Sequence, residues 1–237
     1  MDESEGMIVV FLDSFVFMGS HFGLLLEKTG SHLWLSFVAM VVSMLIAIPI
    51  GLWLGHIHKG EFLAVSVSNI GRALPSLALI AILIGIVGIG FSNVLIALVL
   101  LAAPPILTNT FVAVNSVDRD ITRAGRGMGL HPLQILTRVE LPLALPIIFS
   151  GLRTAAVLVV SSATLATVAG GGGLGDIILN QVAYGLEGVI AGALWVAALA
   201  ILTDQFFAVL LHLLTPKALR GSKREDEERA RVNVAEV

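Results

Sequence analysis

Residues 93–114 have the sequence NVLIALVLLAAPPILTNTFVAV, which contains no charged side chain. A helix of this length, at a rise of 1.5 Å per residue, extends about 33 Å and would cross a membrane hydrocarbon core of about 30 Å. Because no backbone polar group can remain unpaired in lipid, such a segment must be helical if it spans the bilayer. The stretch therefore predicts a transmembrane helix.

Four more apolar segments lie on either side of this one, at residues 33–55, 73–89, 142–168 and 188–214. The chain of 237 residues is 57% hydrophobic and only 13% charged, with a mean hydropathy of +0.96. Soluble domains carry about 25% charged residues. The sequence thus predicts an all-α integral membrane protein with about five transmembrane helices in one domain, residues 31–214.

Residues 8–26 form a sixth apolar stretch, but they include Asp13 and His21 and follow the acidic start MDESEG. These polar groups favour a helix that lies in the membrane interface, although a sixth span stays open. We interpret residues 1–30 as an extracytoplasmic N-terminal segment. Residues 215–237, which include the run KREDEERARVNVAEV, are interpreted as a charged cytoplasmic tail.

The positive charges predict the orientation of the spans. Lys and Arg concentrate in alternate loops and in the C-terminal tail, at Lys59, Arg72, Arg119, Arg123, Arg126, Arg138 and from Lys217 to Arg231. The opposite loops hold only Lys28, and residues 169–187 contain no Lys or Arg. Because positively charged loops remain in the cytoplasm, the loop at residues 116–141 is predicted to be cytoplasmic and the N-terminus to lie outside.

Two short helices are predicted within this cytoplasmic loop, around the sequence RAGRGMGLHPLQILTRVELPLALP of residues 123–146. Ser116 can cap the first helix, which should end near Gly129. Pro132 suits the first turn of the second helix. The spacing of Leu133, Leu136 and Val139 places these side chains on one face, and a docked partner would bury that face.

This helix, glycine turn and helix resemble the cytoplasmic coupling loop of type I ABC importer permeases. The family pattern is EAA, three residues, Gly, nine residues, Ile, any residue, Leu and Pro. The matching positions here are Ala124, Gly129, Val139, Leu141 and Pro142. Arg123 stands where the family has glutamate, and Gly125 stands where it has the second alanine.

Two further stretches resemble the permeases that import the osmoprotectants glycine betaine, carnitine or choline. They are RALPSLALIAILIGIVGIG at residues 72–90 and GGGGLGDIILNQV at residues 170–182. The resemblance implies a type I ABC importer permease fold and a multi-pass location in the plasma (inner) membrane of a prokaryotic cell. It also implies a second permease copy or homologue, cytoplasmic ATPase subunits and an extracytoplasmic substrate-binding protein.

The chain lacks a GxxxxGK[ST] sequence, which would bind the phosphates of ATP and magnesium. We therefore expect a transporter subunit that is not an enzyme and binds no cofactor, with ATP and Mg on a partner ATPase. The run Gly170–Gly175 matches GxGxxG, but it follows a membrane helix rather than a strand, so it predicts an outer turn. The chain has no Cys, and its His residues lack metal-ligand spacing, so no metal site is predicted.

Arg153 and Asp204 are charged residues inside predicted spans, where each needs a partner or water. Arg153 lies about 16 Å along its helix from Pro142, and Asp204 about 18 Å along its own from Pro216. Both prolines mark cytoplasmic ends, so the two charges lie at matching depths. We therefore predict an Arg153–Asp204 ion pair between the fourth and fifth spans.

Two other functions stay open from the residues alone. An ion-coupled secondary carrier would need carboxylates or broken helices at the membrane midplane, and only Asp204 is available. A non-transporting membrane scaffold could use the same partner-binding loop. The sequence leaves the solute, the substrate-binding residues and the choice between a permease homodimer and heterodimer undecided.

Overall fold

The computed structural model describes residues 3–214, and every regular element among them is helical. The elements in chain order are α1 (Glu3–Ser20), α2 (Phe22–His56), α3 (Glu61–Ala73), α4 (Ser76–Val87), α5 (Phe91–Asn115), α6 (Arg119–Gly127), α7 (Pro132–Ile135), the π-helical turn η1 (Leu136–Glu140), α8 (Leu141–Ser162), the 3-10 helix η2 (Ala163–Ala169), α9 (Gly175–Ile178) and α10 (Gln181–Leu214). The tail predicted at residues 215–237 lies outside the described residues.

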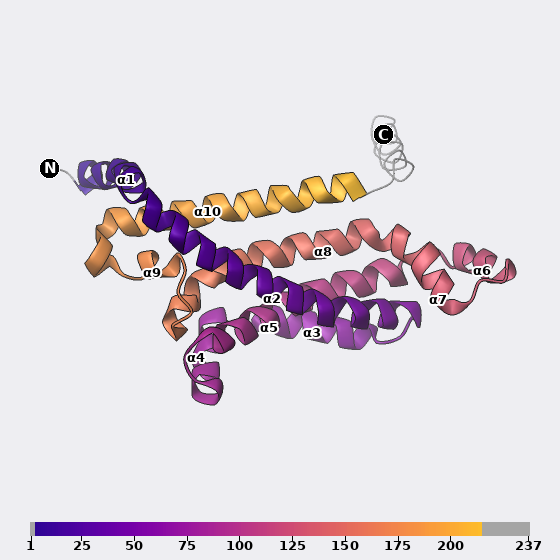
Figure 1. The fold of residues 1–237 in the computed structure, drawn as a ribbon. Helices are drawn as coiled ribbons and strands as arrows, with labels where there is room; N and C mark the ends of the chain where they lie inside the picture. The colour runs from indigo at the N-terminus through magenta and orange to yellow at the C-terminus, as the bar shows by residue number, and fades with distance from the viewer. Residues whose placement is uncertain (1–2, 215–237) are drawn as a thin grey trace, which may run out of the picture.

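Four helical segments among the described residues are long and apolar enough to cross a membrane. They are Phe22–His56, Phe91–Asn115, Pro132–Ala169 and Gln181–Leu213. Figure 1 shows that α2, α5, α8 and α10 extend along one long axis, with α6 and α7 at one end and α9 at the other. These segments correspond to four of the five predicted spans.

The segment expected as the second span, residues 73–89, contains one helix, α4, that is shorter than predicted. α3 ends at Ala73 and α4 begins at Ser76. Between them Pro75 has an extended conformation (φ −65°, ψ 123°), and proline both lacks an N–H group and disfavours a helical conformation in the preceding residue. The 12 residues of α4 extend only about 18 Å, which is less than the thickness of the hydrocarbon core.

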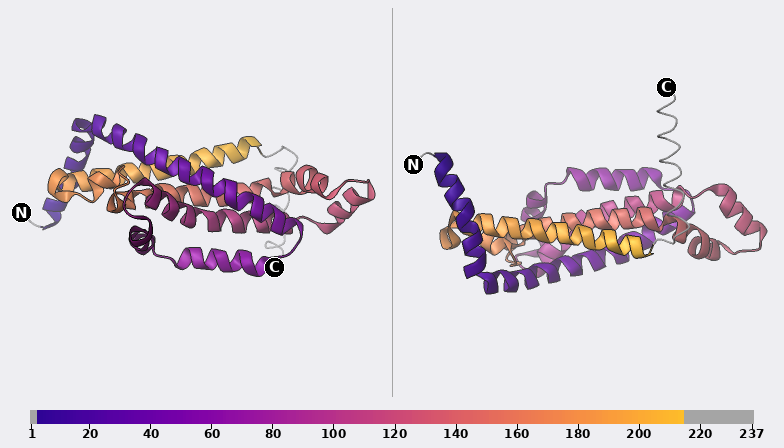
Figure 2. Two further views of the ribbon diagram at one scale, coloured as in Figure 1. Left: turned by 60° about the horizontal axis from the view of Figure 1, so that its bottom comes forward. Right: turned by 90° about the horizontal axis from the view of Figure 1, so that it is seen from above.

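The N-terminal apolar stretch, residues 8–26, is divided at His21 between two helices. Figure 2 shows α1 turned away from the direction of α2. α1 packs on α10, where the buried ring of Phe17 contacts Tyr184 edge to face at 6.2 Å between centroids. α1 is not among the segments that satisfy the length and hydropathy of a span.

The glycine-rich run closes the outer end of the bundle as a compact turn. Gly170, Gly172 and Gly173 have positive φ angles, which only glycine adopts without strain. Asp176, which follows the run, accepts hydrogen bonds from Lys28 Nζ at 2.6 Å and from Thr167 Oγ1 at 2.8 Å. The run follows the 3-10 helix η2 rather than a strand, so it lacks the context of a dinucleotide-binding loop.

α5 is the central helix of the bundle, and glycines of three other helices pack directly against it. A Cβ atom added to any of four glycines would lie 2.5–2.7 Å from an α5 side-chain atom. These are Gly51 and Gly55 of α2, Gly71 of α3 and Gly151 of α8, which face Thr110, Val114, Pro104 and Asn109 respectively. Small residues allow such close approach, which is how membrane helices gain packing contacts without a hydrophobic driving force.

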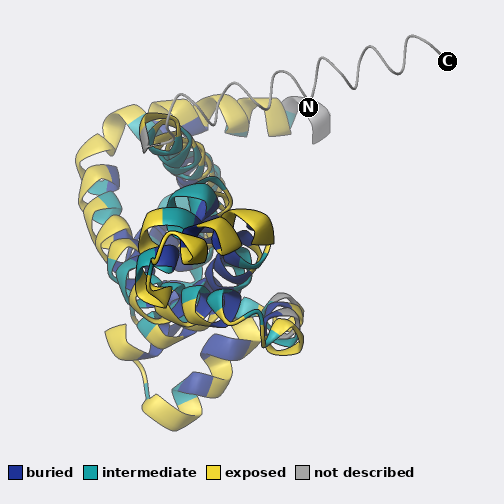
Figure 3. Cartoon of the chain, turned by 90° about the vertical axis from the view of Figure 1, so that its right-hand side faces the viewer, coloured by how far each residue is buried: buried dark blue, intermediate teal, exposed yellow. Residues whose placement is uncertain are grey.

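Burial decreases sharply away from α5. Figure 3 shows buried residues in the middle of the bundle and exposed residues along its outer helices. Only 6% of the most apolar part of α10 is buried within the chain, against 56% for α5. The free face of α10 is therefore available to lipid or to another subunit.

We expect Gly51→Leu to destabilise the protein by about 1–3 kcal/mol, because the new side chain would force α2 away from α5 at Thr110. The matched control is Gly30→Leu on the same helix, where a Cβ atom meets nothing within 4 Å. Thermal unfolding of both variants in detergent measures the difference. Equal unfolding temperatures would contradict the close packing of these two helices.

Candidate functional site

The predicted cytoplasmic loop forms two short helices that project beyond the long helices (Figure 1). The cap of α6 differs from the expected one. Asp118 Oδ1 accepts a hydrogen bond from the Asp120 N–H at 2.8 Å, whereas Ser116 Oγ donates to Ala113 O at the end of α5. Asp118 is the better cap because it accepts the free N–H group with a charged oxygen near the positive end of the helix dipole.

A glycine turn joins α6 to α7, as the sequence predicted. Gly129 has φ +83°, and its N–H donates to Arg126 O at 2.9 Å. α7 begins at Pro132, and the His131 N–H donates to Gln134 Oε1 at 2.9 Å. The turn thus reverses the chain within a few residues.

α7 continues into α8 through the π-helical turn η1. The Leu141 N–H donates to Leu136 O, five residues earlier, and Pro142 has no N–H to donate. The wider turn accommodates the proline without interrupting the helical path. The second half of the loop and the span α8 therefore form one continuous helical path.

The three apolar residues predicted to share a docking face are used differently. Leu133 is 70% exposed, whereas Leu136 packs against the core around α5. Val139 is half-buried on the side of Gly125, and Ile135, which was not predicted, is completely buried. The large apolar side chains of the loop that remain exposed are Ile121, Met128 and Leu133, which we call the exposed loop set.

The two departures from the family pattern have separate structural consequences. Arg123 forms an exposed ion pair with Asp120 at 3.0 Å, within α6 itself, and the adjacent Ala124 is exposed. Gly125 is buried, and a Cβ atom there would lie 3.5 Å from Leu130 Cδ1, an ordinary van der Waals contact. The structure therefore has room for the alanine that the family pattern places at residue 125.

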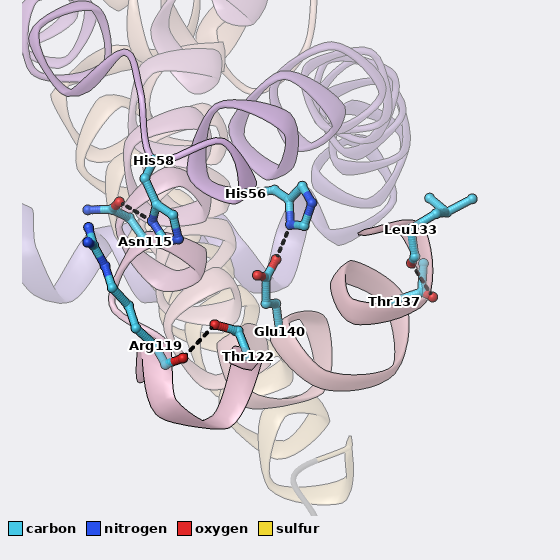
Figure 4. A network of polar contacts seen from close by, with 8 residues as sticks. All are labelled: His56, His58, Asn115, Arg119, Thr122, Leu133, Thr137 and Glu140. Carbon is cyan, nitrogen blue, oxygen red and sulfur yellow. Dashed lines mark hydrogen bonds and ion pairs between the residues drawn. The ribbon is translucent and has the colours of Figure 1, made fainter. Parts of the chain in front are cut away.

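The sequence analysis did not identify Glu140, which connects the loop to the end of α2. Its carboxylate is 1% exposed, and its Oε2 lies 2.6 Å from Nδ1 of His56 at the end of α2 (Figure 4). Nearby, His58 Nδ1 lies 2.9 Å from Asn115 Oδ1 at the end of α5. A buried carboxylate requires such a partner. The pattern allows any residue at position 140, and the partner is 84 residues away, so no local signal identified the pair.

Arg153 of α8 and Asp204 of α10 lie together in the structure. The guanidinium donates through two nitrogens to the two carboxylate oxygens, a geometry that fixes both side chains. The pair borders an open cavity of about 430 Å³ that is also lined by Ser150, Thr154 and Val157. It is the ion pair that joins α8 to the otherwise exposed helix α10 among residues 3–214.

Two substitutions in the loop should have opposite effects on stability. We expect Gly125→Ala to stabilise the protein by about 0.5–1 kcal/mol, because alanine favours the helical state and the site has space. Gly129→Ala should destabilise it by about 1 kcal/mol, because its positive φ strains any residue with a Cβ atom. Thermal unfolding measures both, and a shift of the same sign for both variants would contradict this geometry.

We expect Asp204→Asn to lower the unfolding temperature, because Arg153 then lacks a counter-charge within the membrane. The charge-swapped double variant Arg153→Asp with Asp204→Arg should recover part of the loss. The unfolding temperatures of Asp204→Asn, of Arg153→Asp and Asp204→Arg as single variants, and of the double variant are measured in detergent. Unchanged folding and transport in Asp204→Asn would show that the pair is unimportant.

Residues 47–218 match the family model described as "Binding-protein-dependent transport system inner membrane component". The chain is 39% identical over 208 residues to the "Glycine betaine/carnitine/choline transport system permease protein OpuCB" of Bacillus subtilis, which covers 87% of this chain and 96% of the relative. It is 36% identical over 218 residues to the "Osmoprotectant import permease protein OsmW" of Salmonella typhimurium, covering 88% of this chain and 100% of the relative.

Solved structures show the same fold. A structure described as "Inward facing conformations of the MetNI methionine ABC transporter" superposes with a TM-score of 0.72 and 24% sequence identity, covering 83% of this chain and 99% of that chain. This likeness concerns the fold alone. The family match covers most of the chain, including the loop at residues 116–141 with its Gly129 turn, the Glu140 contact and the helix α8. The chain therefore belongs to the family of binding-protein-dependent transport system inner membrane components, and it is a multi-pass ABC importer permease.

Proposed function

We propose that this permease forms the translocation pathway of an ATP-driven importer for quaternary-amine osmoprotectants such as glycine betaine, carnitine or choline. The relatives named above support this solute class, since each aligns over more than 85% of this chain. The "Carnitine transport permease protein OpuCB" of Listeria monocytogenes, 37% identical over 204 residues, adds the same support.

The observation that carries the coupling role is the exposed loop set at the projecting end of the molecule. Met128 is 77% exposed and Leu133 is 70% exposed, and both lie on a basic cytoplasmic loop. Exposed apolar side chains on a projecting segment fit a partner groove better than water. The partner that we propose is a separate cytoplasmic ABC ATPase, which would bind ATP and Mg.

The contacts of the loop suggest how its movement would reach the membrane. α7, η1 and α8 form one helical path, so a shift of α7 would tilt α8. The His56–Glu140 contact would carry the same shift to α2. Because α2 and α8 both pack against α5, alternating access would follow from their movement against this central helix. A second permease and an extracytoplasmic binding protein complete the proposed assembly.

We expect Leu133→Asp to reduce the ATPase activity that co-purifies with the tagged protein from native membranes by about tenfold or more, because a central apolar anchor contributes about 1–3 kcal/mol to an interface. The matched control is Leu179→Asp. Leu179 is 51% exposed just after α9, at the end of the molecule away from the loop.

Mg-ATP hydrolysis in the eluate and uptake of radiolabelled glycine betaine by cells are measured for both variants. Recovery of the ATPase with wild type and Leu179→Asp, together with its loss in Leu133→Asp, supports the coupling role. Equal recovery with all three proteins would remove Leu133 from the interface. Absence of ATPase activity with wild type would contradict the importer assignment.

A further inference from the structure

Hydroxyl side chains form a stripe along one face of α8. Ser150, Thr154 and Ser162 are separated by four and eight residues, with Leu158 between the last two, a spacing that places them on the same side of a helix. Ser150, Thr154 and Leu158 are exposed, and Ser162 is partly exposed. The opposite face of α8 is buried against α5.

A cavity of about 510 Å³ lies along this stripe, between α8, α5 and the α3–α4 connection. Its polar lining includes Ser68, Ser76, Asn109, Thr154 and Ser162, and none of the lining residues whose side chains the structure describes is charged. Gly71 sets one wall of the cavity, because its close contact with Pro104 brings α3 directly against α5. The volume is in the range of about 300–1,000 Å³ that is typical of small-molecule sites.

Several polar groups around the cavity lack a partner within the chain. Ser68 is only 5% exposed, yet its hydroxyl makes no hydrogen bond with the residues that the structure describes. The hydroxyls of Ser76 and Ser162 make none within residues 3–214 either. None of these three oxygens is among the fully buried side-chain atoms that lack a partner, so their hydroxyls are accessible to water or a polar ligand in the cavity.

The backbone of α5 adds further polar atoms at the same level. Pro104 and Pro105 have no N–H, so the carbonyls of Leu100 and Leu101 lack the donor that an α-helix normally provides four residues later. Asn109 Nδ2 donates to Pro105 O at 2.8 Å, which holds the amide group beside this part of α5. The cavity wall is therefore rich in uncharged oxygen atoms.

Thr154 Oγ1 donates to Ser150 O at 3.0 Å, but the hydroxyls of Ser68, Ser76 and Ser162 have no such partner within the described residues, so this wall is poorly suited to lipid. An unpaired hydroxyl or carbonyl in hydrocarbon costs several kcal/mol, so a polar face on a spanning helix must meet water, solute or protein. The contrast with α2 is clear, since its exposed positions include Leu45, which is 71% exposed and apolar. One surface of the bundle is thus suited to lipid and the other to an aqueous path.

We propose that this cavity is a solute site in the translocation pathway and that it takes the trimethylammonium group of a quaternary amine. The inference rests on the proposed function and extends it to named residues. Neutral oxygen atoms can surround a large, weakly hydrated cation without the strong attraction that a carboxylate would exert. Such weak binding allows the solute to leave the site again during transport.

The Arg153–Asp204 pair makes the site compatible with a cation. Thr154 lines this cavity and also the smaller one beside the ion pair. An unpaired Arg153 there would repel a quaternary ammonium group, whereas Asp204 neutralises its charge. The ion pair therefore has a second consequence besides joining α8 to α10.

The absence of Cys from the whole sequence permits a direct test with single introduced cysteines. Three single-cysteine variants of the assembled transporter are prepared in membranes. Thr154→Cys and Ser162→Cys test the proposed pathway, and Leu45→Cys is the lipid-facing control. The probe is a methanethiosulfonate reagent that bears an ethyltrimethylammonium group. We expect labelling of Thr154→Cys and Ser162→Cys to be about tenfold or more faster than that of Leu45→Cys, because the reaction requires an accessible, ionised thiol.

Glycine betaine or choline at saturating concentration should slow the labelling of Thr154→Cys, and labelling should reduce the uptake that this variant shows before treatment. Labelling of both pathway variants at the rate of Leu45→Cys would overturn the proposal, as would labelling that solute does not slow. Formation of a Thr154→Cys disulfide dimer without labelling would instead identify an interface between two copies, and would also overturn it. Failure of the proposed function is a separate result, because it would abolish ATP-dependent uptake by wild type.

Discussion

Close contact between glycines and α5 is the constraint on which the rest of the structure depends. Hydrophobic burial does little to hold apolar helices together in lipid, so backbone approach and good packing must do so. Gly51, Gly55, Gly71 and Gly151 bring three helices to α5 at distances that no side chain would allow. This packing determines where α2, α3 and α8 lie, and therefore which of their other faces remain open.

The loop at residues 116–141 is linked to this packed centre by a polar contact and by a continuous helix. Glu140 is buried beside His56, and the π-helical turn carries the chain past Pro142 without interrupting the helix. Most of the apolar residues of the loop pack inward on α5 or α6. The exposed loop set is the part of the large apolar surface that is left for a partner. This surface is small, and it is attached directly to the helices that its movement would shift.

The faces left open by the packing are chemically different. Along α8 the open face carries hydroxyls, with an ion pair beside them, whereas the open positions of α2 include large apolar side chains. A membrane protein can expose the second kind of face to lipid but must cover the first with water, solute or protein. The same geometry that makes the bundle stable thus separates a polar path from the lipid boundary.

The sequence by itself determined the membrane class, the cytoplasmic loop with its turn at Gly129, and the depth match of Arg153 with Asp204. These depend on local hydropathy, on charge distribution and on helix rise, all of which act along the chain. It did not predict that the apolar run at residues 73–89 is helical only from Ser76 to Val87, because hydropathy does not register the effect of Pro75 on the backbone.

Tertiary structure alone decided the partner of Glu140, the inward packing of Leu136 and the residues around the α8 cavity. Each of these depends on contacts between segments far apart in the chain. The sequence shows that a polar residue needs a partner, but only the packing of helices around α5 places one within reach.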